Sequence, residues 1–276
     1  MPLLLRTPPR YAELVFHVLA HVRLSAAAPA SVYDPAWIEH SRRTLGDASE
    51  RTLAEDAEAL GVLAPGHEEL ARAQLVAWLF RDHARAHACA TRDLSELRAE
   101  DVDAPELLEP LTHSERAAEL LRVAAELEAP FFDRLPAAAL DWAQLEAALM
   151  QLVAVAPELG RCTVAVLRPL RLRGRVRGSS IWIGAPDLER GPGVQHVAWQ
   201  AAHEATVREV GLAARAAERR VEQMAVVLLA TRAERGGARL EHLRWLAHFG
   251  PNAPDASVGA LSNDERSLVY SLMAAA

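Results

Sequence analysis

The spacing of apolar residues changes near residue 160, and this change limits the possible folds more than any other feature of the chain. Before it, apolar residues such as Tyr11, Leu14 and Val18 recur every three or four positions, which is typical of amphipathic helices. From Cys162 to Ala185 the spacing is that of short strands separated by turns, and helical spacing returns near residue 193. We therefore expect an α+β fold, predominantly α-helical, with one small antiparallel β-meander at about 162–185 packed against a His-bearing helix.

The same pattern predicts how the chain is organised. A helical region is expected over 1–160, and a region with the small β-sheet and the C-terminal helices over 161–276, both integrated in one globular unit. Within the first region, Glu68–Cys89 is expected to form one long helix. The acidic, proline-punctuated segment Leu94–Pro110 is expected to form a loop with one helical turn. Asp141 has the side chain and the position of a helix N-cap.

The composition excludes several classes of protein. All 30 basic residues among the 276 are arginines, and the formal net charge is −7, whereas a general nucleic-acid binder is normally basic. Cys89 and Cys162 are too few for a disulfide framework. No segment has the roughly twenty apolar residues of a membrane span, and Pro8-Pro9 interrupts the apolar start too early for a signal peptide. We expect a cytoplasmic protein that binds neither nucleic acid nor membranes.

Polar side chains lie on the face of the helix around His203 that should be buried. At about 100° per residue, His196, Gln200 and His203 share one stripe with apolar residues, and Glu204 lies at its border. Burying such a group without a partner costs on the order of 1–3 kcal/mol, so each one needs a ligand, a metal or an internal hydrogen bond. The stripe is therefore a candidate binding site, and a pair of hydrogen-bonded core histidines is the alternative.

A predicted strand carries arginines on one face. Every second residue of Leu170–Arg177 is an arginine, which places four like charges on one side, at Arg171, Arg173, Arg175 and Arg177. Trp182 lies in the strand predicted next. Such a face can protect an edge strand from aggregation, can be neutralised by the acidic segment Asp93–Glu109, or can bind an acidic partner through forked arginine–carboxylate contacts.

The five residues from His203 to Val207, His-Glu-Ala-Thr-Val, contain the first half of a His-Glu-x-x-His helix. In that motif two histidines one turn apart bind zinc, and the glutamate acts as general base. The region Cys162–Val210 therefore resembles the strand-and-helix core of zincin-type metallopeptidases in a degenerate form, because Val207 stands at the position of the second histidine. The resemblance implies a zinc-dependent hydrolase or peptidase in which His203 binds the metal and Glu204 is the base.

Histidines of the helical region could supply the missing ligands. His17 and His21 are spaced i, i+4 at the edge of the apolar stripe of the first helix, and this spacing can chelate a metal. A zinc site of His17, His21 and His203, with Glu204 beside it, is one prediction from the sequence. The alternative is that the histidine pair has only a structural role.

Three functions are compatible with these patterns. A peptidase scaffold that has lost its metal can still bind a substrate peptide in an extended conformation along a strand edge. The first function is therefore that of a non-catalytic protein that binds an acidic peptide or protein partner and no cofactor. Its binding residues would be the four arginines, Trp182, His196, Gln200 and His203. By analogy, it resembles accessory proteins that present precursor peptides to tailoring enzymes in bacterial natural-product pathways. The alternatives are the zinc-dependent hydrolase and a helical scaffold without a small-molecule site.

Overall fold

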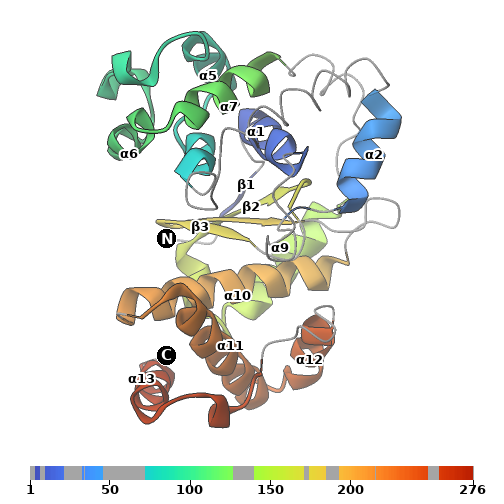
Figure 1. Ribbon diagram of the computed structural model, residues 1–276. Helices are drawn as coiled ribbons and strands as arrows, with labels where there is room; N and C mark the ends of the chain where they lie inside the picture. Colours follow the sequence, from blue (N-terminus) through green and yellow to red (C-terminus); the bar gives the residue numbers. More distant parts are fainter. Residues whose placement is uncertain are drawn as a thin grey trace. The chain divides into compact units, whose positions relative to one another are not determined.

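The computed structural model describes residues 4–6, 10–21, 33, 35–45, 72–126, 140–170, 174–184, 193–214, 216–247 and 255–275 (Figure 1). Contacts divide the chain into two compact units. Unit 1 consists of 1–7, 139–166 and 172–276, and unit 2 of 8–138 and 167–171. Helices dominate both, and a small sheet lies in the chain as well, so the fold is α+β and predominantly helical, as the sequence predicts.

Unit 2 is helical. Its first helix is buried on almost every side rather than along one apolar stripe. Pro35 begins the second helix at a position where its missing N–H group is not needed. The helices described in this unit are α1 (Arg10–His21), α2 (Pro35–Leu45), η1 (Gln74–Trp78), α5 (His83–Cys89), η2 (Leu94–Glu96), η3 (Ala99–Asp101), η4 (Pro105–Leu107), α6 (Leu108–Thr112) and α7 (Glu115–Glu126). The segment expected to be a loop with one helical turn, Leu94–Pro110, consists of three short 3-10 turns that lead into α6.

The prediction of one long helix over Glu68–Cys89 is wrong. The chain forms η1, leaves the helical conformation, and begins again as α5 at His83. The break is stabilised by polar contacts, because the Tyr11 hydroxyl accepts a hydrogen bond from the Phe80 backbone N–H at 2.8 Å and the Asp82 side chain caps α5. The helical spacing of apolar residues continues through this segment, so the sequence pattern does not reveal where the helix is interrupted.

Unit 1 contains the sheet and the longer helices. Asp141 caps α9 by accepting a hydrogen bond from the Gln144 backbone N–H at 3.0 Å, as its position predicts. The elements described here are β1 (Leu4–Arg6), α9 (Trp142–Leu152), η5 (Pro157–Arg161), β2 (Thr163–Leu167), β3 (Arg175–Arg177), β4 (Ser180–Gly184), α10 (Val194–Ala213), α11 (Glu218–Arg235), α12 (Arg239–Ala247), η7 (Val258–Ala260) and α13 (Asn263–Ala274).

The sheet differs in detail from a simple meander. Its strand order is β1-β2-β4-β3, so β3 lies at one edge and pairs with β4 as an antiparallel hairpin. β1 pairs with β2 in parallel and forms the other edge. The sequence does not reveal β1, because three residues between prolines carry no strand periodicity. The position of β3 at an edge is the feature that bears on function.

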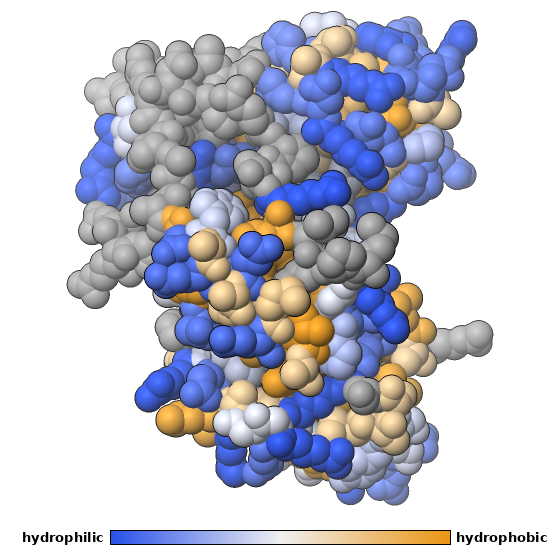
Figure 2. Space-filling view, turned by 180° about the vertical axis from the view of Figure 1, so that it is seen from behind, coloured by the Kyte–Doolittle hydropathy of each residue, from blue (hydrophilic) through white to orange (hydrophobic). Residues whose placement is uncertain are grey.

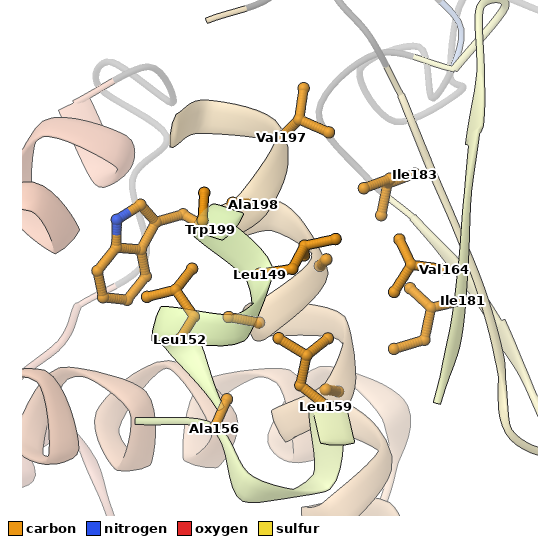
Figure 3. Packing of buried hydrophobic residues seen from close by; sticks show 14 of the residues in the cluster. Leu149, Leu152, Ala156, Leu159, Val164, Ile181, Ile183, Val197, Ala198 and Trp199 are labelled. Atoms are coloured by element: carbon orange, nitrogen blue, oxygen red, sulfur yellow. The ribbon is translucent and has the colours of Figure 1, made fainter. Parts of the chain in front are cut away.

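The core of unit 1 lies between one face of the sheet and the helices beneath it. Figure 3 shows Val164, Ile181 and Ile183 of the strands pointing toward Leu149 of α9 and Val197 of α10. All five side chains are fully or almost fully buried. Since burial of a large aliphatic side chain stabilises a fold by about 1.5–3 kcal/mol, this layer fixes α10 against the sheet.

Some apolar side chains reach the surface. Figure 2 shows a face on which hydrophilic residues predominate and apolar residues are interspersed among them. Trp142 and Met150 of α9 and Leu240 and Leu243 of α12 are exposed. Scattered apolar exposure of this kind is ordinary in folded proteins.

Candidate functional site

The helix that carries the predicted site, α10, is buried on all sides over more than half of its length. Every residue from His196 to Thr206 is buried, not only those on the predicted stripe. Small side chains permit this, because they let α9, α11 and the sheet approach the helix closely. They are Ala198, Ala201, Ala202 and Ala205. A polar side chain anywhere on this segment therefore needs a partner.

Glu204 joins α10 to the edge strand. Its Oε1 atom accepts a hydrogen bond from the Gly174 backbone N–H at 2.7 Å and another from Gln200 Nε2 at 2.8 Å. The contact is so close that a Cβ atom on residue 174 would lie 2.5 Å from Glu204 Cγ and 2.9 Å from the Trp182 carbonyl oxygen. Only glycine fits at this position. The glutamate that the motif suggests as a base thus serves as an acceptor for the start of β3.

Arg208 holds the other end of the same strand. It lies one turn after Glu204 on α10, donates from Nε to the Gly178 carbonyl oxygen in the β3–β4 turn, and forms an ion pair with Glu158 of η5. Gly178 has a φ of 55°, which glycine adopts without strain. The helix therefore fixes both ends of β3 through two side chains, Glu204 and Arg208.

The register of the hairpin shows which way the arginines of β3 point. Arg175 is opposite Trp182, whereas Val176 is opposite Ile181, and directly opposed residues share a face. Val176 and Ile181 pack in the core beside α10, so Arg175 and Arg177 point to the opposite face, where both are half-buried. The two other arginines of the predicted row, Arg171 and Arg173, lie outside the described residues.

The acidic segment that could neutralise those arginines is partly neutralised within unit 2. Asp101 accepts two hydrogen bonds from Arg92, at 3.0 and 3.2 Å, and this contact, with those to Arg98, holds the pKa of Asp101 below its usual value. Asp103 forms an ion pair with Arg85 at 3.3 Å. Arginines close in sequence are therefore the partners of these two carboxylates.

The polar side chains predicted to form one stripe on α10 contact two different neighbouring elements, the start of β3 and α12. Gln200 points to Glu204, on the side of the strand, but the His203 ring stacks 5.2 Å from Trp245 of α12. His242 of α12 is in turn 5.3 Å from the Trp199 ring, which Figure 3 shows pointing away from the sheet. His196, also predicted for the site, is buried near the start of the helix.

His242 and Trp245 are residues that sequence reasoning missed. The run that contains them resembles an amphipathic surface helix, yet both are buried, at 2% exposure. Burial, and next the nearby His203, lowers the pKa of His242 to about 4, so its ring is neutral at pH 7. The spacing of His242, Trp245 and Leu246 along one helical face is the signal that could have identified them.

The histidines of α1 belong to a separate buried cluster in unit 2. His17 Nδ1 accepts a hydrogen bond from Trp37 Nε1 at 3.0 Å, and His21 Nδ1 lies 2.9 Å from the His17 carbonyl oxygen. Arg168 stacks 5.0 Å above Trp37 and binds Glu13 with two hydrogen bonds, at 2.6 and 3.1 Å. Burial, the adjacent His21 and Arg168 keep the pKa of His17 well below its usual value. These contacts join α1, α2 and the segment after β2.

The surroundings of His203 differ from the zincin motif in two respects. Val207 carries no donor atom at the position of the second ligand, and Glu204 is engaged with Gly174. Among the residues that the structure describes, no group of three or more His, Cys, Asp or Glu side chains could hold a metal ion.

Comparison of the chain with family models, with curated proteins and with solved structures finds no match in any of the three. Within the described segments, no helix is long and apolar enough to cross a membrane.

Proposed function

We propose that this protein is a non-catalytic peptide-binding protein that holds an acidic peptide along the outer edge of β3. The observation that carries the proposal is the attachment of this edge strand to α10 at both ends, through Glu204 at Gly174 and Arg208 at Gly178. A strand held in place presents its backbone groups in a fixed geometry, so less conformational entropy is lost when a peptide adds to it.

The preference for an acidic peptide follows from Arg175 and Arg177. Both are on one face of β3 and half-buried, so a carboxylate that approaches them is partly shielded from water. The net charge of the whole protein is −7, which repels an acidic peptide at long range. Salt screens charges over about 8–10 Å, so the local arginines dominate once the peptide is at the strand.

A protein of this kind acts through binding alone. By analogy with accessory proteins that present precursor peptides to tailoring enzymes in bacterial natural-product pathways, the bound peptide would be delivered to a separate enzyme. The position of Glu204 supports a role without catalysis, because its carboxylate oxygen already accepts hydrogen bonds from Gly174 and Gln200.

Fluorescence anisotropy tests the proposal. The probe is a fluorescein-labelled peptide of about ten residues in which Glu alternates with Val, and the reference is the same peptide with Lys in place of Glu. Arg175→Glu and Arg177→Glu should each weaken binding of the acidic peptide by about tenfold or more. Arg235→Glu, at an exposed position in the last turn of α11, is the matched control and should have little effect. Binding that both edge variants leave unchanged would remove β3 from the proposal.

Metal analysis separates this function from that of a zinc hydrolase. Protein purified without a polyhistidine tag is examined for zinc by mass spectrometry, as wild type and as His203→Ala. We expect no stoichiometric zinc in either protein. One zinc ion per chain that is lost in His203→Ala would overturn the non-catalytic function in favour of a metalloenzyme.

A further inference from the structure

The turn between β3 and β4 decides which backbone groups of β3 point outward. Arg177 pairs with Ser180 across a two-residue turn that begins at Gly178, with the positive φ that the primed hairpin turns require. The pair that closes such a turn is hydrogen-bonded, so the next pair, which contains Val176, is not. The N–H and C=O groups of Val176 therefore point away from β4, toward the outer edge of the sheet.

The other outward groups of this edge are bonded within the chain. Gly174 has the same orientation as Val176, and its N–H donates to Glu204 at 2.7 Å while its C=O accepts from Arg175 at 3.0 Å. The Gly178 C=O accepts from Arg208. Along the described part of the edge, Val176 is thus the position that offers both an N–H and a C=O to an added strand. Within this described part of the edge, main-chain pairing is limited to one residue of a bound peptide.

Side chains next to Val176 supply the remaining recognition. Residues of an added strand directly opposite Arg175 and Arg177 would have Cβ atoms about 4.5–5.5 Å from theirs, on the same face. The Arg175 guanidinium group donates to the outward carbonyl of Gly174, which places it at the edge. A guanidinium group has five N–H donors, so it can bind a peptide carboxylate in addition to this contact.

The residue opposite Val176 meets a different environment. Its side chain would lie on the face that holds Gly174 and Val176, where Val176 packs against the apolar core. Glu204 lies on the same side, against Gly174. A carboxylate there would be repelled by that of Glu204, whereas an apolar side chain would extend the core packing.

From these positions we infer that the edge of β3 recognises an acidic–apolar–acidic sequence, in which the apolar residue pairs with the Val176 backbone and each carboxylate binds one arginine. The inference rests on the peptide-binding function proposed above and specifies the register of the peptide. The ligand is thus a short extended peptide segment with carboxylates two residues apart.

Peptides of equal composition test the register. The fluorescein-labelled probes are Ser-Gly-Glu-Val-Glu-Gly-Ser and Ser-Gly-Val-Glu-Glu-Gly-Ser, with fluorescence anisotropy as the readout. The first peptide should bind at least about tenfold more tightly, because adjacent carboxylates of an extended strand point to opposite faces. N-methylation of its Val should weaken binding about tenfold or more, and N-methylation of its first Glu less than about threefold.

A protein variant gives the complementary test. Val176→Pro removes an N–H that points away from β4, so the hairpin keeps its internal bonds and the variant should fold, as circular dichroism would verify. It should weaken binding of the Glu-Val-Glu peptide about tenfold, and binding as tight as that of wild type would overturn the pairing of the peptide with Val176.

The outcomes distinguish this inference from the function on which it rests. Equal binding of the two isomeric peptides, with loss of binding in Arg177→Glu, would overturn the register and leave peptide binding in place. No binding of either peptide at about millimolar concentration would overturn both proposals.

Discussion

Replacing Gly174 with alanine should destabilise unit 1 by about 1–3 kcal/mol. A Cβ atom at this position would lie 2.5 Å from Glu204 Cγ, 2.8 Å from Glu204 Cδ and 2.9 Å from the Trp182 carbonyl oxygen. If Glu204 stays, the overlap costs about 1–3 kcal/mol as overpacking. If Glu204 moves away, the Gly174 N–H loses an acceptor that is a charged group, and such a hydrogen bond contributes about 1.5–3 kcal/mol.

A double-mutant cycle isolates the contact between the two residues. Glu204→Ala removes the Cγ and Cδ atoms that the new methyl group would meet, so Gly174→Ala should cost less in that background. The double variant should be more stable than the sum of the single effects predicts, by about 1 kcal/mol or more. The assay is urea unfolding followed by circular dichroism.

Gly211→Ala is the matched control for this cycle. Gly211 is an exposed glycine of α10 whose added Cβ would make only an ordinary contact, at 3.7 Å from Val221 Cγ1. Alanine should therefore stabilise the helix there by about 0.5–1 kcal/mol. Additivity of Gly174→Ala and Glu204→Ala within about 0.5 kcal/mol would refute the proposed attachment of β3 to α10.

Three further predictions follow from buried polar groups of unit 1. Arg232 binds Glu209 at 2.6 and 2.8 Å and the Leu272 carbonyl oxygen at 2.9 Å. Arg232→Met should therefore lower the free energy of unfolding in urea by about 3 kcal/mol. Arg235→Met, at an exposed position, should change it very little. His242 has a pKa of about 4 when folded and about 6.5 when unfolded, so its neutral form favours folding above pH 6.5. The free energy of unfolding of wild type should therefore fall by about 3 kcal/mol as the pH falls from 6.5 to 4. For His242→Phe the fall should be correspondingly smaller, and an equal fall would contradict the assignment. Burial raises the pKa of the Cys162 thiol to about 11, so iodoacetamide at about pH 8 should alkylate it only after unfolding, and rapid labelling of the native protein, detected by mass spectrometry, would contradict this.

Local signals predict the helices and their starts well. Asp141 caps α9 because an Asp side chain at that position accepts a backbone N–H three residues later, a contact that needs no knowledge of the rest of the fold. The alternation of Arg175, Val176 and Arg177 likewise predicts which residues share a face of β3. Such features depend on residues that are close in sequence.

Contacts between distant segments could not be predicted in the same way. β1 is a strand only because Leu4, Leu5 and Arg6 pair with residues 163–165, and nothing within three residues encodes that partner. The burial of His242 depends on packing of α12 against α10, which an apolar count along α12 does not reveal. The break after η1 depends in the same way on the Tyr11 hydroxyl, 69 residues before Phe80.

The pair His203-Glu204 shows how one sequence pattern can serve two structural roles. The two side chains are about 100° apart around α10, so they meet different neighbours. His203 stacks on Trp245 of α12, whereas Glu204 accepts the Gly174 N–H at the start of β3. Polar side chains of α10 thus hold two neighbouring elements in place, and the element held by Glu204 is the strand whose outer edge we propose as the peptide-binding edge.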